Sequence, residues 1–183
     1  MRAIDLGKRT LLVERDRIGG TGIYNGALTS KTLWEIANRV SSTNELMRTR
    51  GREPFRLSWE EISKTVNEAI FERKYLYACH MQLLANAKEG HVLFHHERGH
   101  ARFTAPDRVR IQRTGFDVEV SADHIVVATG SRPRSVPDIA VDEQHIFTSD
   151  GIFGIEELPS SIVIIGAGVI GCEFATIFCN LGA

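Results

Sequence analysis

Two stretches of the chain place apolar residues at helical spacing. From Ser30 the pattern predicts a helix, on the strength of Leu33, Ile36, Ala37 and Val40. Residues 41–57 are polar, and we expect a loop there. A second helix is predicted from Ser58, because Ser58 and Glu61 have the spacing of a capping box. Its apolar stripe continues toward Gly90, which predicts a long helix packed on the domain or against a second subunit.

Other stretches have the length and alternation of strands. Arg9–Glu14 (RTLLVE) is short, aliphatic and typical of a buried parallel strand. Residues 91–120 alternate with a period near two between Gly and Pro-Asp turns, which predicts an antiparallel β-meander. Two further apolar runs, 124–130 (HIVVATG) and 161–166, predict buried strands, and residues 168–181 predict a helix.

Composition and charge exclude several classes of protein. The chain has 183 residues, 43% hydrophobic and 25% charged, which is a globular balance. The formal net charge of -1 does not favour nucleic acid or an anionic membrane. No apolar run approaches the ~20 residues that a membrane-spanning helix needs, and acidic and basic residues interrupt the N-terminal segment too early for a signal peptide.

The cysteines and histidines do not predict a metal site. The three cysteines form no CxxC pair, and we interpret them as small buried residues of a cytosolic protein: Cys79, Cys172 and Cys179. His95, His96, Glu97 and His100 lack the register of a zinc helix, and Gly99 interrupts them. A turn between strands is the interpretation that we prefer for this segment.

The most specific local motif is a glycine-rich turn between an apolar strand pattern and an apolar helix pattern. Gly166, Gly168 and Gly171 have the GxGxxG spacing in the context that a dinucleotide-binding turn requires. Gly166 permits a tight turn, Gly168 lets the backbone approach a pyrophosphate, and Gly171 allows close packing of helix and strand. The residue about 20 positions further on, which selects NAD or NADP, lies beyond this sequence.

A second glycine-rich segment carries a resemblance to a known family. Residues 19–31 read GGTGIYNGALTSK, which resembles the GGTCxxxGCxPSK segment of the flavin-dependent pyridine nucleotide-disulfide oxidoreductases. LLVERDRIGGT, SKTL, GHARF, HIVVATGSRP and VIIGAGVIGCEFA follow in the order and at the spacings of that family. Gly22 and Ala27 stand where the family has its redox cysteines, so this segment cannot carry out thiol–disulfide exchange.

The resemblance implies an α/β fold. It implies an incomplete FAD/NAD(P)-binding, Rossmann-like, two-domain fold with an antiparallel β-meander. On this basis we expect residues 1–136 to form part of an FAD-binding domain, 137–160 a connector, and 161–183 the start of an NAD(P)-binding domain. The family's first strand and phosphate loop would precede Arg9–Glu14, and we find neither in this sequence.

The resemblance also implies roles for individual residues. Residues expected to bind FAD are Glu14 at the adenosine ribose, Gly20 and Thr21 along the pyrophosphate, the backbone near Ala101 at the adenine, and Thr129, Gly130 and Ser131 over the flavin nucleotide. Those expected to receive NAD or NADP are Gly166, Gly168, Val169, Ile170, Gly171 and Glu173. Lys31 and Glu173 correspond to a charge pair beside the flavin, and they are the candidate catalytic residues, with Lys31 also contacting the cofactor.

Flavin-mediated hydride transfer is therefore the predicted activity. The soluble transhydrogenase branch needs no disulfide and is the best match, although Thr29 and Tyr24 replace residues usual in that branch. The alternatives are a truncated, non-catalytic paralogue or scaffold, motivated by the missing phosphate loop, and a dihydrolipoamide dehydrogenase-like protein without its disulfide. A disulfide reductase that uses Cys79 is disfavoured, because nothing places Cys79 near Gly22. The resemblance implies nicotinamide dinucleotides as partners, a cytoplasmic location, and a homodimer for the full-length protein.

Overall fold

The computed structural model describes residues 2–85 and 93–183. The chain forms two compact units that interleave along the sequence. The first unit combines the residues up to Gly20 with residues 74–129, and the second combines residues 21–73 with 130–183. Among the described residues, no helix has the length and apolarity needed to cross a membrane.

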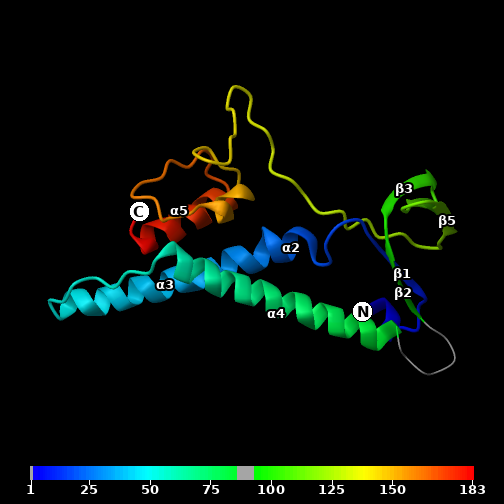
Figure 1. Ribbon diagram of the computed structural model, residues 1–183, viewed down its shortest axis with the longest axis horizontal. Helices are drawn as coiled ribbons and strands as arrows, with labels where there is room; N and C mark the ends of the chain where they lie inside the picture. The colour runs from blue at the N-terminus through cyan, green and yellow to red at the C-terminus, as the bar shows by residue number, and fades with distance from the viewer. Residues whose placement is uncertain (1, 86–92) are drawn as a thin grey trace. The chain divides into compact units, whose positions relative to one another are not determined.

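The first unit contains a small parallel sheet. A short helix, α1 (Arg2–Asp5), precedes β1 (Thr10–Glu14), which pairs in parallel with β2 (Phe94–Arg98) (Figure 1). The predicted parallel strand is thus confirmed. It is half-buried rather than buried, with Leu12 38% exposed, because β2 is its only strand neighbour in the described part of the chain.

An antiparallel meander follows. β3 (His100–Ala105), β4 (Arg108–Gln112) and β5 (Asp117–Ser121) pair antiparallel in the order β3-β4-β5, as predicted. The first predicted segment of the meander, from residue 91, is different. Residues 91 and 92 lie outside the described residues, and Phe94 begins β2, which belongs to the parallel sheet.

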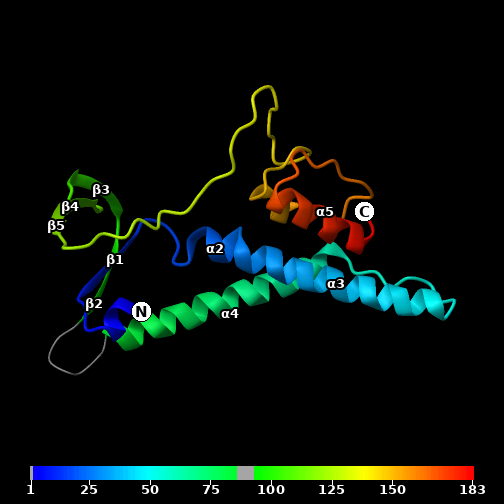
Figure 2. The same cartoon turned by 180° about the vertical axis from the view of Figure 1, so that it is seen from behind.

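The second unit is built from helices around one apolar core. Its elements are α2 (Gly20–Tyr24), of which Gly20 is counted in the first unit, α3 (Ala27–Thr49), the first half of α4 (Trp59–Ala85), the short 3-10 helix η1 (Gly151–Gly154) and α5 (Val169–Leu181) (Figure 2). Buried side chains from three helices form the core: Leu33, Ala37, Trp59, Ile62, Val66 and Ile177. This core holds α5 beside α3.

The predicted polar loop at 41–57 is wrong in its first half. α3 continues to Thr49. A solvent-exposed part of a helix needs no apolar stripe, because its backbone hydrogen bonds are made within the helix. The remaining loop is tied back to the helix by Asn44. Its side chain accepts a hydrogen bond from the Phe55 N–H at 2.7 Å and donates one to the Phe55 carbonyl at 3.1 Å.

The predicted capping box at the start of α4 is confirmed. The Glu61 carboxylate accepts hydrogen bonds from the Ser58 N–H and hydroxyl, both at 2.8 Å. The Glu61 N–H donates to the Ser58 hydroxyl at 3.3 Å. These hydrogen bonds from Ser58 lower the pKa of Glu61. Reciprocal capping satisfies backbone groups that the first helical turn leaves without partners.

The predicted buried strands at 124–130 and 161–166 are wrong. Neither segment is a strand, and most of their apolar side chains are exposed, with Val126 at 88% and Val163 at 90%. A strand forms only when a neighbour completes its hydrogen-bond ladder, and no strand in the described residues pairs with either segment. The helix predicted at 168–181 is confirmed as α5, and Gly182 closes it with φ +103°.

Candidate cofactor-binding site

The turn that enters α5 follows a segment, residues 161–166, that is not a strand, but it has backbone features that favour glycine. Gly166 has φ +112°, in the left-handed region that favours glycine. A Cβ at Gly171 would collide with the Gly166 carbonyl oxygen and would lie 3.3 Å from the Ile164 side chain. Two of the three glycines are therefore required by the backbone itself. Gly168 is different, because no atom lies within 4 Å of the position of an added Cβ.

The N-terminal end of α5 is suited to phosphate groups. Gly168 is extended at φ -76° and ψ 179°, and no side chain caps the helix. The N–H groups of the first helical turn have no acceptor within the helix, and they carry its partial positive charge. Val169 and Ile170, at 84% and 56% exposed, leave this end open. The residues present thus fit a dinucleotide at this turn.

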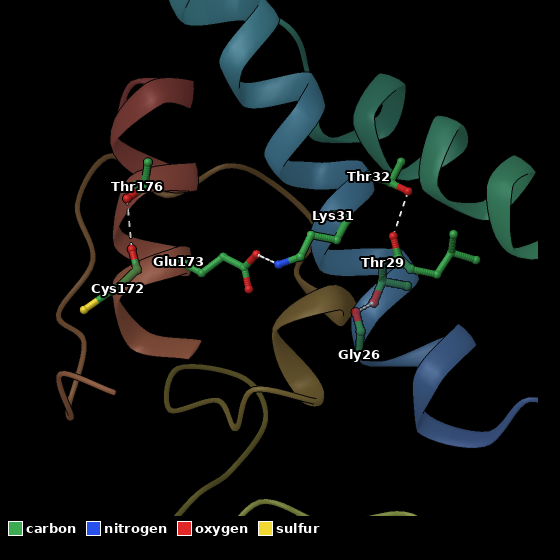
Figure 3. Close-up of polar contacts among 8 residues, drawn as sticks. Gly26, Thr29, Lys31, Thr32, Cys172, Glu173 and Thr176 are labelled. Carbon is green, nitrogen blue, oxygen red and sulfur yellow. Dashed lines mark hydrogen bonds and ion pairs between the residues drawn. The ribbon is translucent and has the colours of Figure 1, made fainter. Parts of the chain in front are cut away.

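Lys31 and Glu173 form an ion pair between α3 and α5. The Lys31 ammonium donates a hydrogen bond to the Glu173 carboxylate across 142 residues of sequence (Figure 3). The Glu173 side chain is 17% exposed and that of Lys31 is 66% exposed. An ion pair this open to water contributes little to stability, about 1 kcal/mol at most. Its main effect is to hold a positive charge in a defined place beside α5.

The turn between α2 and α3 contains the two positions, 22 and 27, where the sequence has no cysteine. Gly22 lies in α2 with open space where a Cβ would point, and Ala27 begins α3. A Cβ at Gly26 would lie only 2.6 Å from the Thr21 carbonyl oxygen, so the close approach requires glycine there. Thr29 is buried and donates a hydrogen bond from its hydroxyl to the Gly26 carbonyl at 2.9 Å.

The residues expected to bind FAD are divided between the two units. In the first unit, Glu14 ends β1, and its carboxylate accepts a hydrogen bond from the Asp16 N–H at 2.8 Å. An acid at the carboxyl end of a parallel strand suits a ribose hydroxyl. Gly20 has φ +46°, Ala101 is an exposed residue of β3, and Thr129 is exposed in an extended segment.

In the second unit the structure brings together two of these residues from distant motifs. A Cβ built on Gly130 would lie 3.5 Å from the Thr21 hydroxyl, and Gly130 has φ +77°. Ser131 follows directly and is exposed. These small residues leave room for a ligand, and Thr21 and Ser131 supply hydroxyl groups that could bind it.

The cysteines and histidines differ from the sequence-based interpretation. Cys172 and Cys179 are exposed, because Ile177 and Phe178 occupy the buried face of α5. Cys79, in α4, is half-buried. His95, His96 and Glu97 lie in strand β2 rather than in a turn; of that segment only Gly99 lies between β2 and β3. Within residues 2–85 and 93–183, no group of three or more metal-ligating side chains comes together.

Sequence reasoning missed a second polar contact between α3 and α5. The Asn180 side-chain amide donates a hydrogen bond to the Asn38 side-chain oxygen at 3.2 Å, and both residues are half-buried. The available signal was spacing: Asn38 follows Lys31 by seven residues, and Asn180 follows Glu173 by seven.

Comparison with known proteins identifies the family of the chain. The whole chain, residues 1–183, matches the family described as pyridine nucleotide-disulphide oxidoreductase. The soluble pyridine nucleotide transhydrogenase of Mycobacterium bovis is 34% identical over 186 residues, which cover 97% of this chain and 37% of that protein. The dihydrolipoyl dehydrogenase of Bacillus subtilis is 31% identical over 194 residues, covering 100% of this chain and 39% of that protein.

A solved structure shows the same fold. The HOCl-induced flavoprotein disulfide reductase of Escherichia coli, in its Cu(II) complex, superposes with a TM-score of 0.74 at 23% identity, over 100% of this chain and 37% of that chain. The chain therefore spans little more than a third of the proteins it resembles. It belongs to the pyridine nucleotide-disulphide oxidoreductase family, whose members use FAD and NAD(P).

Proposed function

We propose that this chain is part of an FAD-dependent oxidoreductase of the soluble transhydrogenase type. It would transfer hydride between NAD(P)H and flavin without a redox disulfide. The observation that carries the proposal is the Lys31–Glu173 ion pair, formed next to a turn in which Gly22 and Ala27 replace the cysteines. The charge pair remains in the absence of the thiols, and the 34% identity with a soluble transhydrogenase supports the same activity.

The two charged residues have distinct roles in this proposal. When bound, FAD would supply the acceptor for hydride from a reduced nicotinamide. Lys31 would supply a positive charge that favours the electron-rich, reduced ring. Glu173 would orient the ammonium group, since it accepts the Lys31 hydrogen bond from the more buried side of the pair. Neither residue needs to transfer a proton for this role.

The proposed binding residues form two groups, one for each cofactor. Glu14, Gly20, Thr21, Ala101 and the 129–131 segment would hold FAD, and the start of α5 from Gly166 to Glu173 would receive NAD or NADP. We accordingly assign residues 1–136 to an FAD-binding domain, 137–160 to a connector, and 161–183 to the start of an NAD(P)-binding domain. A cytoplasmic, homodimeric full-length protein is part of the same proposal.

One alternative has an observation in its favour. The 31% identity with a dihydrolipoyl dehydrogenase is compatible with a protein of that type that has lost its disulfide. The two functions differ at Gly22 and Ala27, because oxidation of a dithiol substrate by exchange requires a protein disulfide, which neither residue can form. Transfer between two nicotinamides has no such requirement.

The test uses protein expressed from the complete reading frame. We expect a yellow protein with a flavin spectrum that reduces a thio-NAD analogue with NADPH and does not oxidise dihydrolipoamide. Replacing Lys31 by Met should slow flavin reduction, whereas Lys64→Met, an exposed lysine of α4, serves as the matched control. A protein that stays colourless with added FAD, or a flavoprotein that exchanges no hydride between nicotinamides, would contradict the proposal.

A further inference from the structure

We propose that Asn38 and Asn180 are positioning residues that set the register of α3 against α5 and so place Lys31 on Glu173. The effect on hydride transfer rests on the proposed function. The register of α3 against α5 does not depend on that function. Both helices belong to the same compact unit, and both asparagine side chains are half-buried at their contact.

The two polar contacts repeat with the same spacing. Lys31 to Glu173 and Asn38 to Asn180 each span 142 residues, so both contacts lie in one register. Seven residues make about two helical turns, so each pair of residues lies on one face of its helix, about 10 Å apart. Both contacts advance in the same direction along the sequence, which means that α3 and α5 run parallel. A slip of either helix by one turn would break both contacts.

The apolar part of the contact cannot set this register alone. Leu33, Ala37 and Ile177 are at most 1% exposed and pack in the same core. Aliphatic contacts are non-directional and tolerate small displacements along a helix axis. A half-buried amide pair does not, because a slip leaves polar groups without partners in a poorly hydrated place. Buried polar pairs set helix register in other packed helices for the same reason.

The ion pair is also a poor determinant of register. The Lys31 side chain is 66% exposed and has a flexible four-carbon stem, so it can follow Glu173 through helix displacements smaller than one turn and does not fix the register by itself. The asparagine side chains are short and meet at 3.2 Å, which leaves little such freedom. Asn38 and Asn180 therefore fix the position of α3 along α5, and this position brings Lys31 to Glu173.

The experiment measures the contact between Lys31 and Glu173 directly. A carbodiimide joins an amine to a carboxylate only where the two groups touch, and peptide mass spectrometry quantifies the Lys31–Glu173 cross-link in the full-length protein. The variants are isosteric. Asn38→Asp and Asn180→Asp each leave one amide donor facing one acceptor, whereas the double Asp variant has two acceptors and no donor. Asn44→Asp is the control, because Asn44 lies on the same helix and its side chain bonds the loop residue Phe55 rather than α5 in the described part of the chain.

We expect the double variant to lose at least three-quarters of the cross-link, at an unchanged circular dichroism spectrum. Each single variant and Asn44→Asp should keep more than half. Retention of the cross-link in the double variant, or an equal loss in Asn44→Asp, would overturn the proposal. If the double variant fails to fold, Asn38→Ser and Asn180→Ser are compared in its place, with the same expected loss relative to Asn44→Ser.

A second measurement separates this inference from the proposed function. In the flavin-loaded full-length protein, flavin reduction by NADPH should fall about tenfold in the double variant and recover in Asn38→Asp. A protein without hydride transfer in which the cross-link still depends on the asparagines would refute the proposed function and leave the positioning role intact. If hydride transfer is intact but the cross-link does not depend on the asparagines, the positioning role is refuted and the proposed function stands.

Discussion

Two glycine-rich turns precede two neighbouring helices, α3 and α5, and they differ in which of their glycines the backbone requires. The turn before α5 keeps the whole GxGxxG pattern, with the left-handed Gly166 and the crowded Gly171. The turn before α3 keeps the crowded Gly26 but has glycine at 22, where a Cβ would point into open space. The backbone requires glycine at positions 166 and 171 of the first turn, although not at position 168. The backbone does not require glycine at position 22, because a Cβ there would meet no other atom within 4 Å.

This difference separates the shape of a site from its chemistry. Both turns still position the helices that follow them, and Lys31 and Glu173 meet between those helices. Gly22 and Ala27 provide no thiols for disulfide exchange at the α2–α3 turn, whereas the ion pair between α3 and α5 is present. Substitutions at matched glycines test the backbone requirement for glycine in each turn, and substitutions at Lys31 test the role of the charge pair.

The largest effect is expected at Gly171. Gly171→Ala places a methyl group against the Gly166 carbonyl, and relief of that overlap should cost about 3 kcal/mol of unfolding free energy. The control is Gly168→Ala, where the added methyl meets open space and the backbone is ordinary, so stability should change by less than about 0.5 kcal/mol. Urea unfolding measures both, and equal effects would mean that the two glycines do not differ as described.

The charge pair should matter for rate more than for stability. Lys31→Met in the flavin-loaded protein is expected to slow flavin reduction by NADPH about 10²-fold, the size typical of a lost electrostatic contact to developing charge. Unfolding free energy should fall by no more than about 1 kcal/mol, because the Lys31 side chain is mostly in water. Stopped-flow absorbance gives the rate. A stability loss without a rate effect would assign the pair a structural role only.

A third helix start sharpens the comparison, because α4 begins with a polar cap instead of glycine. Ser58→Ala should cost about 1 kcal/mol in thermal or urea unfolding, whereas Ser63→Ala within the same helix should be neutral or slightly stabilising. The pKa of Glu61 is lowered by its hydrogen bonds with Ser58. Its contribution is therefore present above the ordinary carboxyl pKa of about 4.3 and is lost as pH falls through the lower folded-state value. The difference between wild type and Ser58→Ala should shrink on acidification below about pH 4, and a difference that grows would contradict this account.

The smallest effect is expected at Gly22. Gly22→Ala adds a methyl group into open space in a helix whose φ at this residue is not positive, so it should stabilise the protein by about 0.5–1 kcal/mol. The matched substitution, Gly26→Ala, should destabilise it, since the new Cβ would crowd the Thr21 carbonyl. Differential scanning calorimetry of the two variants gives shifts of opposite sign. A destabilised Gly22→Ala would mean that position 22 is as constrained as position 26.

Local signals were sufficient for several elements. The Ser58–Glu61 capping box, the helix after the GxGxxG turn and the parallel strand ending at Glu14 were all predicted, because each depends on residues within a few positions of one another. The strands expected at 124–130 and 161–166 failed for the opposite reason. An apolar run becomes a strand only beside another strand, and the sequence of the run does not specify that partner.

The candidate site divides in the same way. The sequence by itself identified the candidate residues, namely Lys31, Glu173 and the two glycine-rich turns, and it showed that positions 22 and 27 have no thiols. Only the tertiary structure decided that α3 and α5 run parallel in one register, that Lys31 reaches Glu173, and that Asn38 meets Asn180. The reason is physical: contacts across 142 residues are set by how buried side chains pack together, and no local pattern specifies that packing.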